Sequence, residues 1–267
     1  DTSAVDALKK DLAELRNRKI HLLKSAGFPE DYLEPVYDCP DCKDTGYIGN
    51  KKCHCFKKAI IGLLYDQSNI KKFPVEADFS NFRLDYYPVS HYDKKTGRSS
   101  RSMMEDTLRI CHHFIDSFGT EFNNLFFYGD VGVGKTFLST CIAKEIMNRE
   151  YSVLYFSAPQ LFNTLAKNAF DKNDIDAHNM CEYIFDCDLL IIDDLGTEYT
   201  NAFIASQFFT CINERLLHRK STIISTNLSL ESLADLYTER SFSRITSRYS
   251  LLKIVGDDIR IKKKLEH

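Results

Sequence analysis

From residue 103 onward, short apolar runs alternate with longer amphipathic stretches. Five such runs fall near residues 124–129, 153–158, 188–193, 222–227 and 251–255. Apolar runs of this length are typical of strands buried on both faces, and the stretches between them are long enough for helices. Alternating strands and helices predict an α/β fold, in which helices cover both faces of a parallel five-stranded sheet.

The first hundred residues follow a different pattern. Apolar residues recur at helical spacing near the start, at Val5, Leu8, Leu12, Leu15 and Leu22. They predict a helix that ends near residues 27–29 and packs on a neighbouring module or a partner. A second helix is expected over residues 56–65, and a solvated loop over residues 90–101. We therefore divide the chain into an N-terminal module (1–70), a linker and adenine-side segment (71–102) and a core (103–267).

The first run of the core leads directly into a phosphate-binding loop. Residues 129–136 read Gly-Asp-Val-Gly-Val-Gly-Lys-Thr. The glycines allow a tight turn whose N–H groups point at phosphate oxygens, and the helix that follows adds its positive end. A turn that binds nothing is the alternative, but a strand before the motif and a helix after it favour nucleotide binding. The expected contacts are Gly129, Asp130, Val131, Gly132, Val133, Gly134, Lys135, Thr136 and Phe137.

Within this loop and the neighbouring strand ends, individual catalytic roles can be assigned. Lys135 is expected to reach the β- and γ-phosphates, and Thr136 to bind Mg²⁺. Asp193 ends an apolar run and would complete the Mg²⁺ shell, while Asp194 would activate the attacking water. Capping of the next helix is the alternative role for Asp194. Asn227, at the end of another run, could hold the same water or the γ-phosphate, or be an ordinary turn residue.

Four of the nine cysteines are clustered. Cys39, Cys42, Cys53 and Cys55 form a Cys-x₂-Cys and a Cys-x-Cys pair ten residues apart, and the sequence between them predicts a hairpin closed at residues 49–50. Four thiolates in a reducing compartment predict a zinc site, with disulfides or incidental thiols as alternatives. His54 could replace Cys53 or Cys55 as a ligand. The other five cysteines are expected in the core.

Composition sets limits on the partners. The 267 residues are 43% apolar, enough for a core, and the net charge of −3 argues against a generally basic nucleic-acid coat. Any DNA binding must come from a local patch. No secretory signal or membrane-length apolar run is visible, so we expect a cytoplasmic protein without a membrane partner.

Arginines late in the chain are candidates for a contact with phosphate. Arg240, Arg244 and Arg248 recur every four residues and so share a helix face. One of them could act as an arginine finger across a subunit interface, although solvated arginines are more common on helices. Arg260 could contact phosphate within its own subunit. Only eleven residues follow Gly256, too few for a C-terminal helical lid, so we expect a neighbouring subunit to complete the site.

Two aromatic residues are candidates for the base of the nucleotide. Phe79 and Phe82 precede the core in the adenine-side segment. Aromatic or apolar side chains usually cover the base at the entrance to such a core, so these two rings could flank adenine. Packing in the core is the alternative reading for both.

Together these motifs resemble those of the bacterial helicase-loader ATPases of the DnaC/DnaI family, members of the AAA+ class, and the chain is similar to the transposition ATPase IstB. The resemblance rests on the phosphate loop, residues 190–198 and 225–227, Ser243-Arg244-Ile245, and residues 256–260. It implies that Asn227 is sensor 1, Arg244 the arginine finger and Arg260 the sensor 2 residue. It also implies that residues 159–186 line a single-stranded DNA channel, with Lys167, Phe170 and Lys172 as candidate contacts.

The resemblance implies an ATP-dependent loader that self-associates through its core, binds the hexameric DnaB-like replicative helicase and delivers it onto single-stranded DNA. The cofactors would be ATP or ADP, Mg²⁺ and Zn²⁺. A cysteine knuckle before the core favours DnaI-like loaders, because transposition ATPases lack it. The alternatives are an IstB-like transposition ATPase and an ATP-switched adaptor whose hydrolysis is incidental. A small-molecule kinase is disfavoured, since no acceptor-binding residues are apparent.

Overall fold

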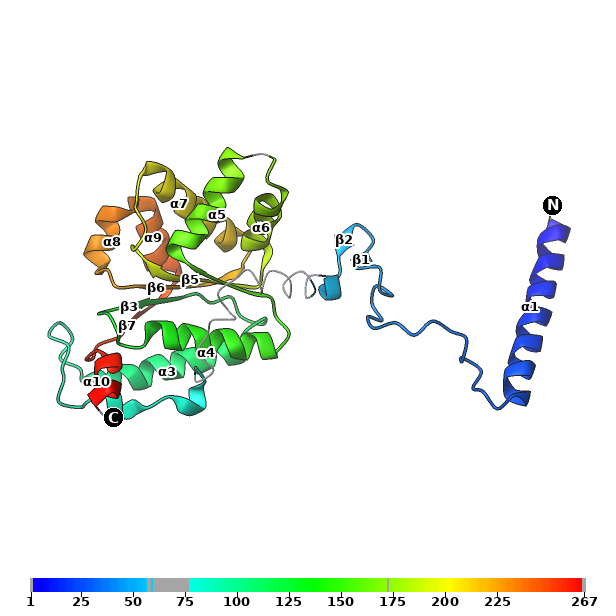
Figure 1. Ribbon diagram of the computed structural model, residues 1–267, viewed down its shortest axis with the longest axis horizontal. Coiled ribbons are helices and arrows are strands. Elements are labelled where there is room, and N and C mark those ends of the chain that lie inside the picture. The colour runs from blue at the N-terminus through cyan, green and yellow to red at the C-terminus, as the bar shows by residue number, and fades with distance from the viewer. Residues whose placement is uncertain (1, 57–58, 60–76, 172, 266–267) are drawn as a thin grey trace. The chain divides into compact units, whose positions relative to one another are not determined.

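The computed structural model describes residues 2–56, 59, 77–171 and 173–265 (Figure 1). The chain divides into two compact units, residues 1–56 and residues 57–267. Among the helices of the described ranges, none combines the length and the apolar character that crossing a bilayer needs.

The N-terminal unit contains one long helix and one small hairpin. Helix α1 (Thr2–Ser25) confirms the helix predicted from the apolar spacing, and it ends in a turn at Gly27, whose φ is +81°. The N–H of Phe28 closes this turn on the carbonyl of Leu23, at 2.9 Å. Strands β1 (Tyr47–Ile48) and β2 (Lys51–Lys52) pair antiparallel around residues 49–50, as predicted. Most of the helix expected over residues 56–65 lies outside the described residues.

The second unit is built on a five-stranded sheet. Its strands are β3 (Leu125–Tyr128), β4 (Val153–Ser157), β5 (Leu189–Leu195), β6 (Ser221–Thr226) and β7 (Ser250–Lys253). Their order is β4-β5-β6-β3-β7 and every pairing is parallel. Each predicted strand is found within about two residues of its expected position. The sheet therefore confirms the α/β architecture expected from the alternating runs.

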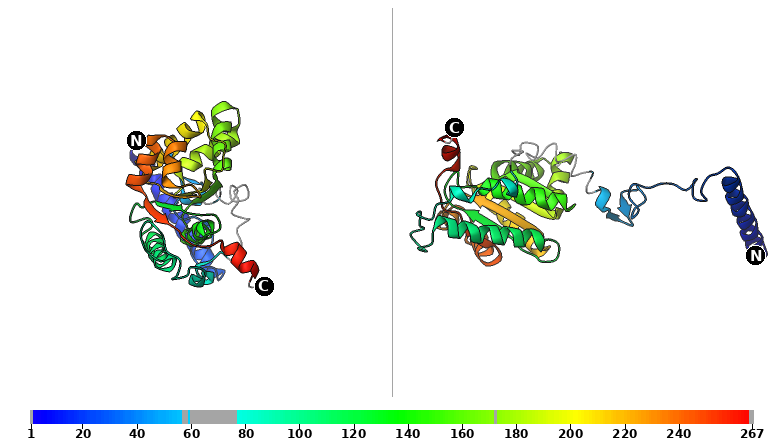
Figure 2. Two further views of the ribbon diagram at one scale, coloured as in Figure 1. Left: turned by 90° about the vertical axis from the view of Figure 1, so that its left-hand side faces the viewer. Right: turned by 90° about the horizontal axis from the view of Figure 1, so that it is seen from below.

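Helices cover both faces of this sheet (Figures 1 and 2). Helices α3 (Ser100–Asp116) and α4 (Lys135–Asn148) lie on one face. The other face carries α5 (Ala158–Phe170), α6 (Ile175–Asp186), α7 (Ala202–Leu217), α8 (Leu230–Leu236) and α9 (Glu239–Arg248). The short helix α10 (Ile259–Leu265) follows β7, and two 3₁₀ turns, η2 (Phe79–Asn81) and η3 (Leu84–Tyr86), precede α3.

Local capping explains where these helices begin. Helix α3 starts at Ser100, inside the loop predicted over residues 90–101, because the side chain of Ser99 accepts the N–H of Ser102 at 3.2 Å. Ser157 and Gln160 form a capping box at the start of α5. Because α3 begins at Ser100, the loop predicted over residues 90–101 ends about two residues earlier than expected.

Each face of the sheet has its own apolar core. One cluster joins α3 and α4 to the sheet and includes Phe114, Phe127 and Ile142. The other joins α5, α6, α7 and α9 to the opposite face and includes Phe162, Phe208 and Ile245. Four of the five scattered cysteines, at 111, 181, 187 and 211, are buried in these clusters, and Cys141 is buried as well, as expected.

One charged side chain is completely buried beneath the second cluster. Arg215 of α7 has no exposed surface. Its guanidinium donates to the carbonyls of Ile184 (2.7 Å) and Cys187 (3.1 Å) near the end of α6, and to the carbonyl of Ser221 (2.6 Å) at the start of β6. The last carbonyls of a helix have no intrahelical partner and carry partial negative charge, so Arg215 both satisfies and neutralises this helix end.

Candidate functional site: a nucleotide-binding edge of the sheet

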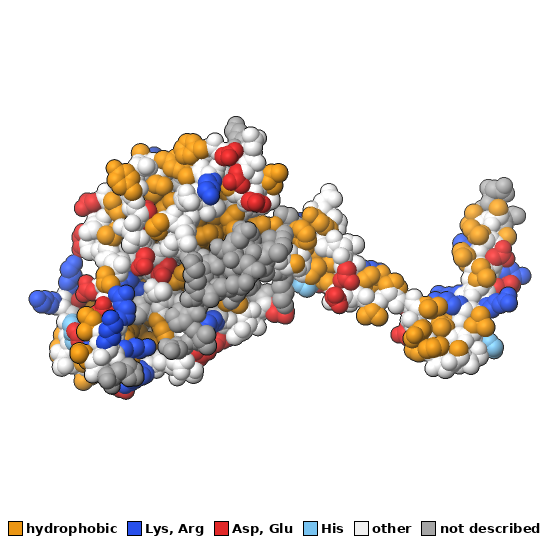
Figure 3. Space-filling model, viewed as in Figure 1, with side chains coloured by type: hydrophobic (Ala, Val, Ile, Leu, Met, Phe, Trp, Pro, Cys, Tyr) orange, Lys and Arg blue, Asp and Glu red, His pale blue; other side chains and the backbone are white. Residues whose placement is uncertain are grey.

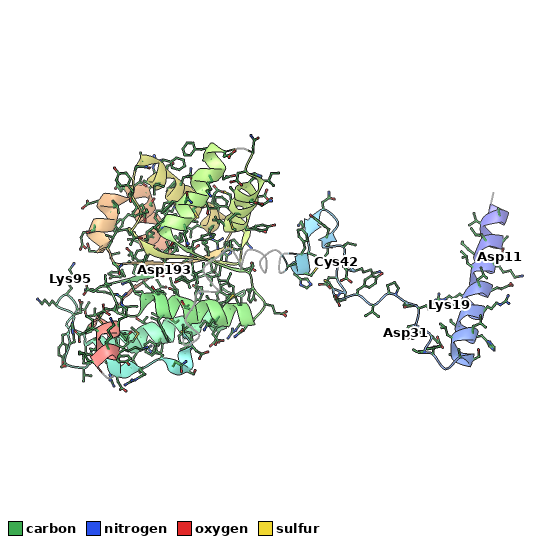
Figure 4. All side chains as sticks on the ribbon, viewed as in Figure 1. Asp11, Lys19, Asp31, Cys42, Lys95 and Asp193 are labelled. Carbon is green, nitrogen blue, oxygen red and sulfur yellow. The ribbon has the colours of Figure 1, made fainter. Side chains whose placement is uncertain are left out.

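The predicted catalytic side chains lie where three neighbouring strands end. The phosphate loop follows β3, Asp193 and Asp194 lie near the end of β5, and Asn227 follows β6. Strand β6 is the neighbour of both β3 and β5, so the carboxyl ends of all three meet at one edge of the sheet. This is the edge at which parallel α/β sheets bind ligands. Asp193 is labelled there in Figure 4.

The phosphate loop needs its glycines for space as well as for conformation. Gly129, Gly132 and Gly134 all have positive φ, at +141°, +78° and +102°. A Cβ atom on Gly129 would lie 2.1 Å from the carbonyl oxygen of Ile254, and one on Gly134 would lie 2.6 Å from the hydroxyl of Tyr87. The loop is therefore held tightly between its neighbours, and helix α4 starts within the motif, at Lys135.

Lys135 lies inside the loop. Its Nζ donates to the carbonyl oxygens of Gly129 (2.8 Å) and Asp130 (2.6 Å), and only 4% of the residue is exposed. Burial lowers the pKa of Lys135, and the nearby charges of Asp194 and Asp193 oppose this effect. A phosphate would offer the ammonium group a stronger, charged acceptor than the two carbonyls do.

The two side chains predicted to bind Mg²⁺ are in contact with each other. The hydroxyl of Thr136 donates to Asp193, at 3.0 Å from Oδ2 and 3.2 Å from Oδ1. Ser225 of β6 also donates its hydroxyl to Asp193, a contact that the sequence analysis missed. The feature of the sequence that could have indicated this contact is a hydroxyl side chain within the apolar run that forms β6. A hydroxyl and a carboxylate at this spacing fit the hard oxygen ligands that Mg²⁺ prefers.

Asp194 occupies an unusual backbone position. Its φ is +56°, and the pairing of β5 with β6 shifts register between Ile192 and Leu195, so the strand bulges at this point. The amide of Asn227 lies 3.5 Å from the Asp194 carboxylate. Burial raises the pKa of Asp194, and the negative charge of Asp193 adds to this effect. The bulge thus brings a basic carboxylate and a polar amide to the same edge.

Tyr87, which was not among the predicted site residues, holds the phosphate loop through a hydrogen bond. The hydroxyl of Tyr87 donates to the carbonyl of Val133 at 2.8 Å, and the residue is buried. The ring of Phe82 stacks on that of Tyr87 (centroids 5.7 Å apart), and Phe79 lies against His112 at 4.8 Å. Phe79 and Phe82 both pack on the apolar core. The adenine contact expected of these two residues stays a prediction.

Helix α10 begins directly beside the phosphate loop. The N–H of Ile259 donates to the carbonyl of Gly132 at 3.0 Å, and a Cβ on Gly132 would meet the carboxyl group of Asp258. Arg260 pairs with Asp258, with Nε 3.3 Å from Oδ1. Arg260, the predicted sensor 2 residue, is thus paired with a carboxylate that contacts the phosphate loop. The sequence did not indicate this contact between Asp258 and the loop.

The three arginines of α9 are exposed. Two of them lie near Phe122, just before β3, whereas the phosphate loop follows the other end of that strand. Arg244 and Arg248 line a surface hollow together with Phe122, Leu217 and Arg219. Within the described part of the chain, no ion pair involves the guanidinium groups of α9. These residues are thus available to a neighbouring molecule, as an arginine finger requires.

The four clustered cysteines converge in the N-terminal unit, where Figure 4 labels Cys42. Their Sγ atoms all lie within 4.8 Å of one another, with Cys39 and Cys53 3.7 Å apart. Tetrahedral zinc, with zinc–sulfur bonds of about 2.3 Å, has sulfur–sulfur edges of roughly 3.8 Å. Burial opposes ionisation of Cys42, but hydrogen bonds from Cys55 and the Gly46 N–H lower its pKa to about 7. The donor set fits zinc.

His54 lies beside this cluster. Its Nε2 is 3.4 Å from the sulfur of Cys39 and 3.2 Å from the carboxylate of Asp41. The same ring nitrogen therefore faces a carboxylate as well as the thiols. The geometry groups the four sulfurs and leaves the imidazole at their edge.

The segment expected to line a DNA channel forms helices α5 and α6. Lys167 is exposed, and the ring of Phe170, which is 77% exposed, lies 4.9 Å from that of Phe203. Lys172 lies outside the described residues. A DNA contact by these side chains stays a prediction.

The family model described as "IstB-like ATP binding protein" matches residues 67–267. The chain belongs to this IstB-like ATP-binding family. Membership agrees with the complete phosphate loop and with the carboxylates of β5, and it makes the second unit an AAA+ ATPase core.

Relatives of this IstB-like chain include proteins of phage-like elements and of replication. It is 27% identical over 240 residues to the phage-like element PBSX protein XkdC of Bacillus subtilis (strain 168), covering 85% of this chain and 84% of XkdC. It is 29% identical over 115 residues to the replicative helicase loader DnaI of the same organism, covering 43% of this chain and 36% of DnaI. The chain thus spans about a third of DnaI.

The fold agrees with a solved loader structure. The crystal structure of the DnaC helicase loader aligns with a TM-score of 0.52 and 25% identity, covering 66% of this chain and 97% of that one.

Proposed function

We propose that this protein is an ATP-dependent loader, which binds the hexameric replicative helicase and delivers it onto single-stranded DNA. The observation that carries the proposal is the combination of a complete IstB-like nucleotide site with a separate four-cysteine unit. Proteins named as replicative helicase loaders are among the relatives of the chain, which supports the same role here.

In the proposed reaction, each residue at the sheet edge has one task. Lys135 would exchange its two carbonyl acceptors for phosphate oxygens, and Thr136 with Asp193 would hold Mg²⁺, which neutralises phosphate charge. Asp194 would accept a proton from the attacking water, while Asn227 orients that water. The raised pKa of Asp194 makes it a better base than an ordinary aspartate at neutral pH.

Completion of the site is assigned to a neighbouring copy. Arg244 is exposed and lies away from its own phosphate loop. As a finger in a second subunit it would stabilise charge on the transferred phosphoryl group, which raises hydrolysis by about 10³- to 10⁵-fold in comparable enzymes. Arg260 would contact phosphate from within the same subunit.

The four cysteines are proposed to hold zinc and to fold the module that grips the helicase. Chelation by Cys39, Cys42, Cys53 and Cys55 would fix the β1–β2 hairpin and the turn before it. A unit with so small an apolar core needs a metal to hold one conformation.

The test is native mass spectrometry of the full chain with the replicative helicase of its host, with ATP·Mg²⁺ or with ADP. A complex that is lost in the Cys39→Ser/Cys42→Ser variant, but kept in Lys51→Ser at the hairpin, supports the loader. Absence of a complex with either nucleotide would contradict it and favour a transposition ATPase.

Asp194→Asn distinguishes a hydrolysis-driven switch from an adaptor. The substitution should leave ATP binding intact and lower hydrolysis by about 10²-fold or more. A helicase that stays bound and inactive with this variant supports the switch. Normal helicase release with hydrolysis abolished would support the adaptor instead.

A further inference from the structure

Helix α1 exposes a narrow apolar stripe, which no described residue of its own unit covers. Its five apolar members are each 52% to 62% exposed; they are Val5, Leu8, Leu12, Leu15 and Leu22. Leu23, which directly follows Leu22 and flanks the stripe, is by contrast only 8% exposed, and its carbonyl accepts the N–H of Phe28 in the turn that ends α1. The local structure thus buries one leucine and leaves the stripe bare.

The spacing of the stripe has the period of a coiled coil. Its members are separated by three, four, three and seven residues, which places Val5 and Leu12 at heptad position a, and Leu8, Leu15 and Leu22 at position d. A helix that packs in a groove or on a core has a broader apolar face, whereas a seam of a and d alone is the pattern of paired helices.

Charged residues flank this seam. Position e holds Lys9, Arg16 and, at the end of the helix, Leu23, and the charged residues at position g are Asp11 and Arg18. Figure 3 shows basic side chains beside apolar ones on this helix, and Figure 4 labels Asp11 and Lys19 on it. Flanking charges limit the apolar contact to the seam and select the partner by complementarity.

The charges fit a second copy of the same helix in parallel orientation. In that arrangement Asp11 at g lies opposite Arg16 at e of the second copy. Because the pair of helices is symmetric, the dimer contains this attractive charge pair twice. An antiparallel pair would match Asp11 with Arg18, but it would also bring Lys9 against Arg16. The parallel register contains no such repulsive flank.

We propose that α1 pairs with α1 of a second copy of this chain as a parallel two-stranded coiled coil. Lys19 occupies an a position, where a polar side chain lowers stability but favours a defined register and oligomeric state. The helix has 24 residues, about 36 Å or three heptads, so the pairing is weak and depends on protein concentration. This surface is additional to the proposed helicase contact and to self-association through the ATPase core.

The first experiment is sedimentation equilibrium of the full chain over a concentration series, without nucleotide. All variants carry Arg244→Ala, so that contacts through the predicted finger do not contribute. Leu12→Asp should raise the dissociation constant of the dimer at least roughly tenfold, since it places a charge in the seam. Ala13→Asp, its neighbour on the outer face, is the matched control and should leave it unchanged. Equal dissociation constants for the two variants would overturn the proposal.

A charge exchange tests the orientation. Asp11→Arg and Arg16→Asp should each weaken the dimer by roughly two- to fivefold, because each replaces two attractions by two repulsions at exposed positions. The double variant Asp11→Arg/Arg16→Asp restores the attraction and should recover wild-type association. Failure of this recovery would overturn the parallel pairing. A Leu12→Asp variant that keeps its self-association but loses the helicase would show that the stripe docks on the helicase instead.

Discussion

The two units of this protein differ in what stabilises each of them internally. In the second unit, two apolar clusters sandwich a parallel sheet and supply dozens of buried side chains. In the N-terminal unit, the buried apolar residues among those described are Leu23, Cys39, Cys42 and Cys53. Large apolar side chains in that unit are instead exposed, from Val5 to Ile48. Figure 3 shows hydrophobic side chains exposed along α1 and on the turn that follows it.

This difference shows how a chain can separate catalysis from contact. A phosphate site must hold charged groups in fixed positions, so it is built on a rigid, apolar scaffold. A surface that recognises partners must keep apolar side chains accessible until the partner arrives. The same apolar composition therefore gives a closed core in one unit and open surfaces in the other.

The largest expected effect tests whether a metal replaces the missing core of the N-terminal unit. A strong chelator, or Cys42→Ser, should expose residues 36–56 to limited proteolysis while residues 77–265 stay protected. Zinc contributes about 10 to 16 kcal/mol in small structural sites, more than this unit can replace. Lys51→Ser is the control, and unchanged protection of the hairpin after removal of metal would refute the zinc assignment.

A smaller effect is expected from the buried charge of the core. Arg215→Met should lower the free energy of unfolding by about 3 kcal/mol or more, because it leaves carbonyls at the end of α6 and the start of β6 without donors. Urea unfolding followed by circular dichroism measures it. Arg248→Met, on the exposed end of α9, should cost less than about 0.5 kcal/mol. Equal midpoints for the two variants would contradict this account of Arg215.

The phosphate loop should respond to crowding more than to backbone strain. Gly129→Ala brings a Cβ to 2.1 Å from the Ile254 carbonyl and should cost about 2 kcal/mol of stability, with loss of ATP binding. Gly97→Ala also has positive φ but meets no atom within 4 Å, so it should cost only about 1 kcal/mol. Thermal unfolding and titration with an ATP analogue compare the two. If both glycines behave alike, strain rather than contact governs the loop.

The smallest expected effect is that of the Asp194 carboxylate, the proposed catalytic base, on the free energy of unfolding. The raised pKa of Asp194 means that the folded state holds this proton more tightly than the unfolded state. Stability is therefore lost as pH rises through the window between the two pKa values, and no penalty remains below the unfolded one. Asp194→Asn should stabilise the nucleotide-free protein by about 0.5 kcal/mol at neutral pH, with no gain at low pH. A gain independent of pH would exclude a charge effect.

Much of the catalytic edge could be predicted because its chemistry is local in sequence. The phosphate loop, the apolar run ending in Asp193 and the run ending near Asn227 are each recognisable within eight residues. Once these strands are neighbours in a parallel sheet, their carboxyl ends meet at one edge. Metal-ligand spacing likewise indicated which four cysteines meet.

Other contacts could not be predicted, because they join residues distant in the chain. Tyr87 supports Val133 over a separation of 46 residues, and Ser100 donates its hydroxyl to the carbonyl of Val255. The contact of Asp258 with Gly132 depends on how α10 leaves β7. Nothing in the local pattern around these residues marks them as neighbours.

The sequence by itself determined the strands, the phosphate loop, the carboxylates and the cysteine cluster, since each depends on short-range periodicity or on the chemistry of adjacent residues. Only the tertiary structure decided that Ser225 holds Asp193, that a bulge carries Asp194 to Asn227, and that Arg215 is buried. These outcomes depend on which strands become neighbours and on how their side chains fill the space between sheet and helices. That is a property of packing, which no single stretch of the chain contains.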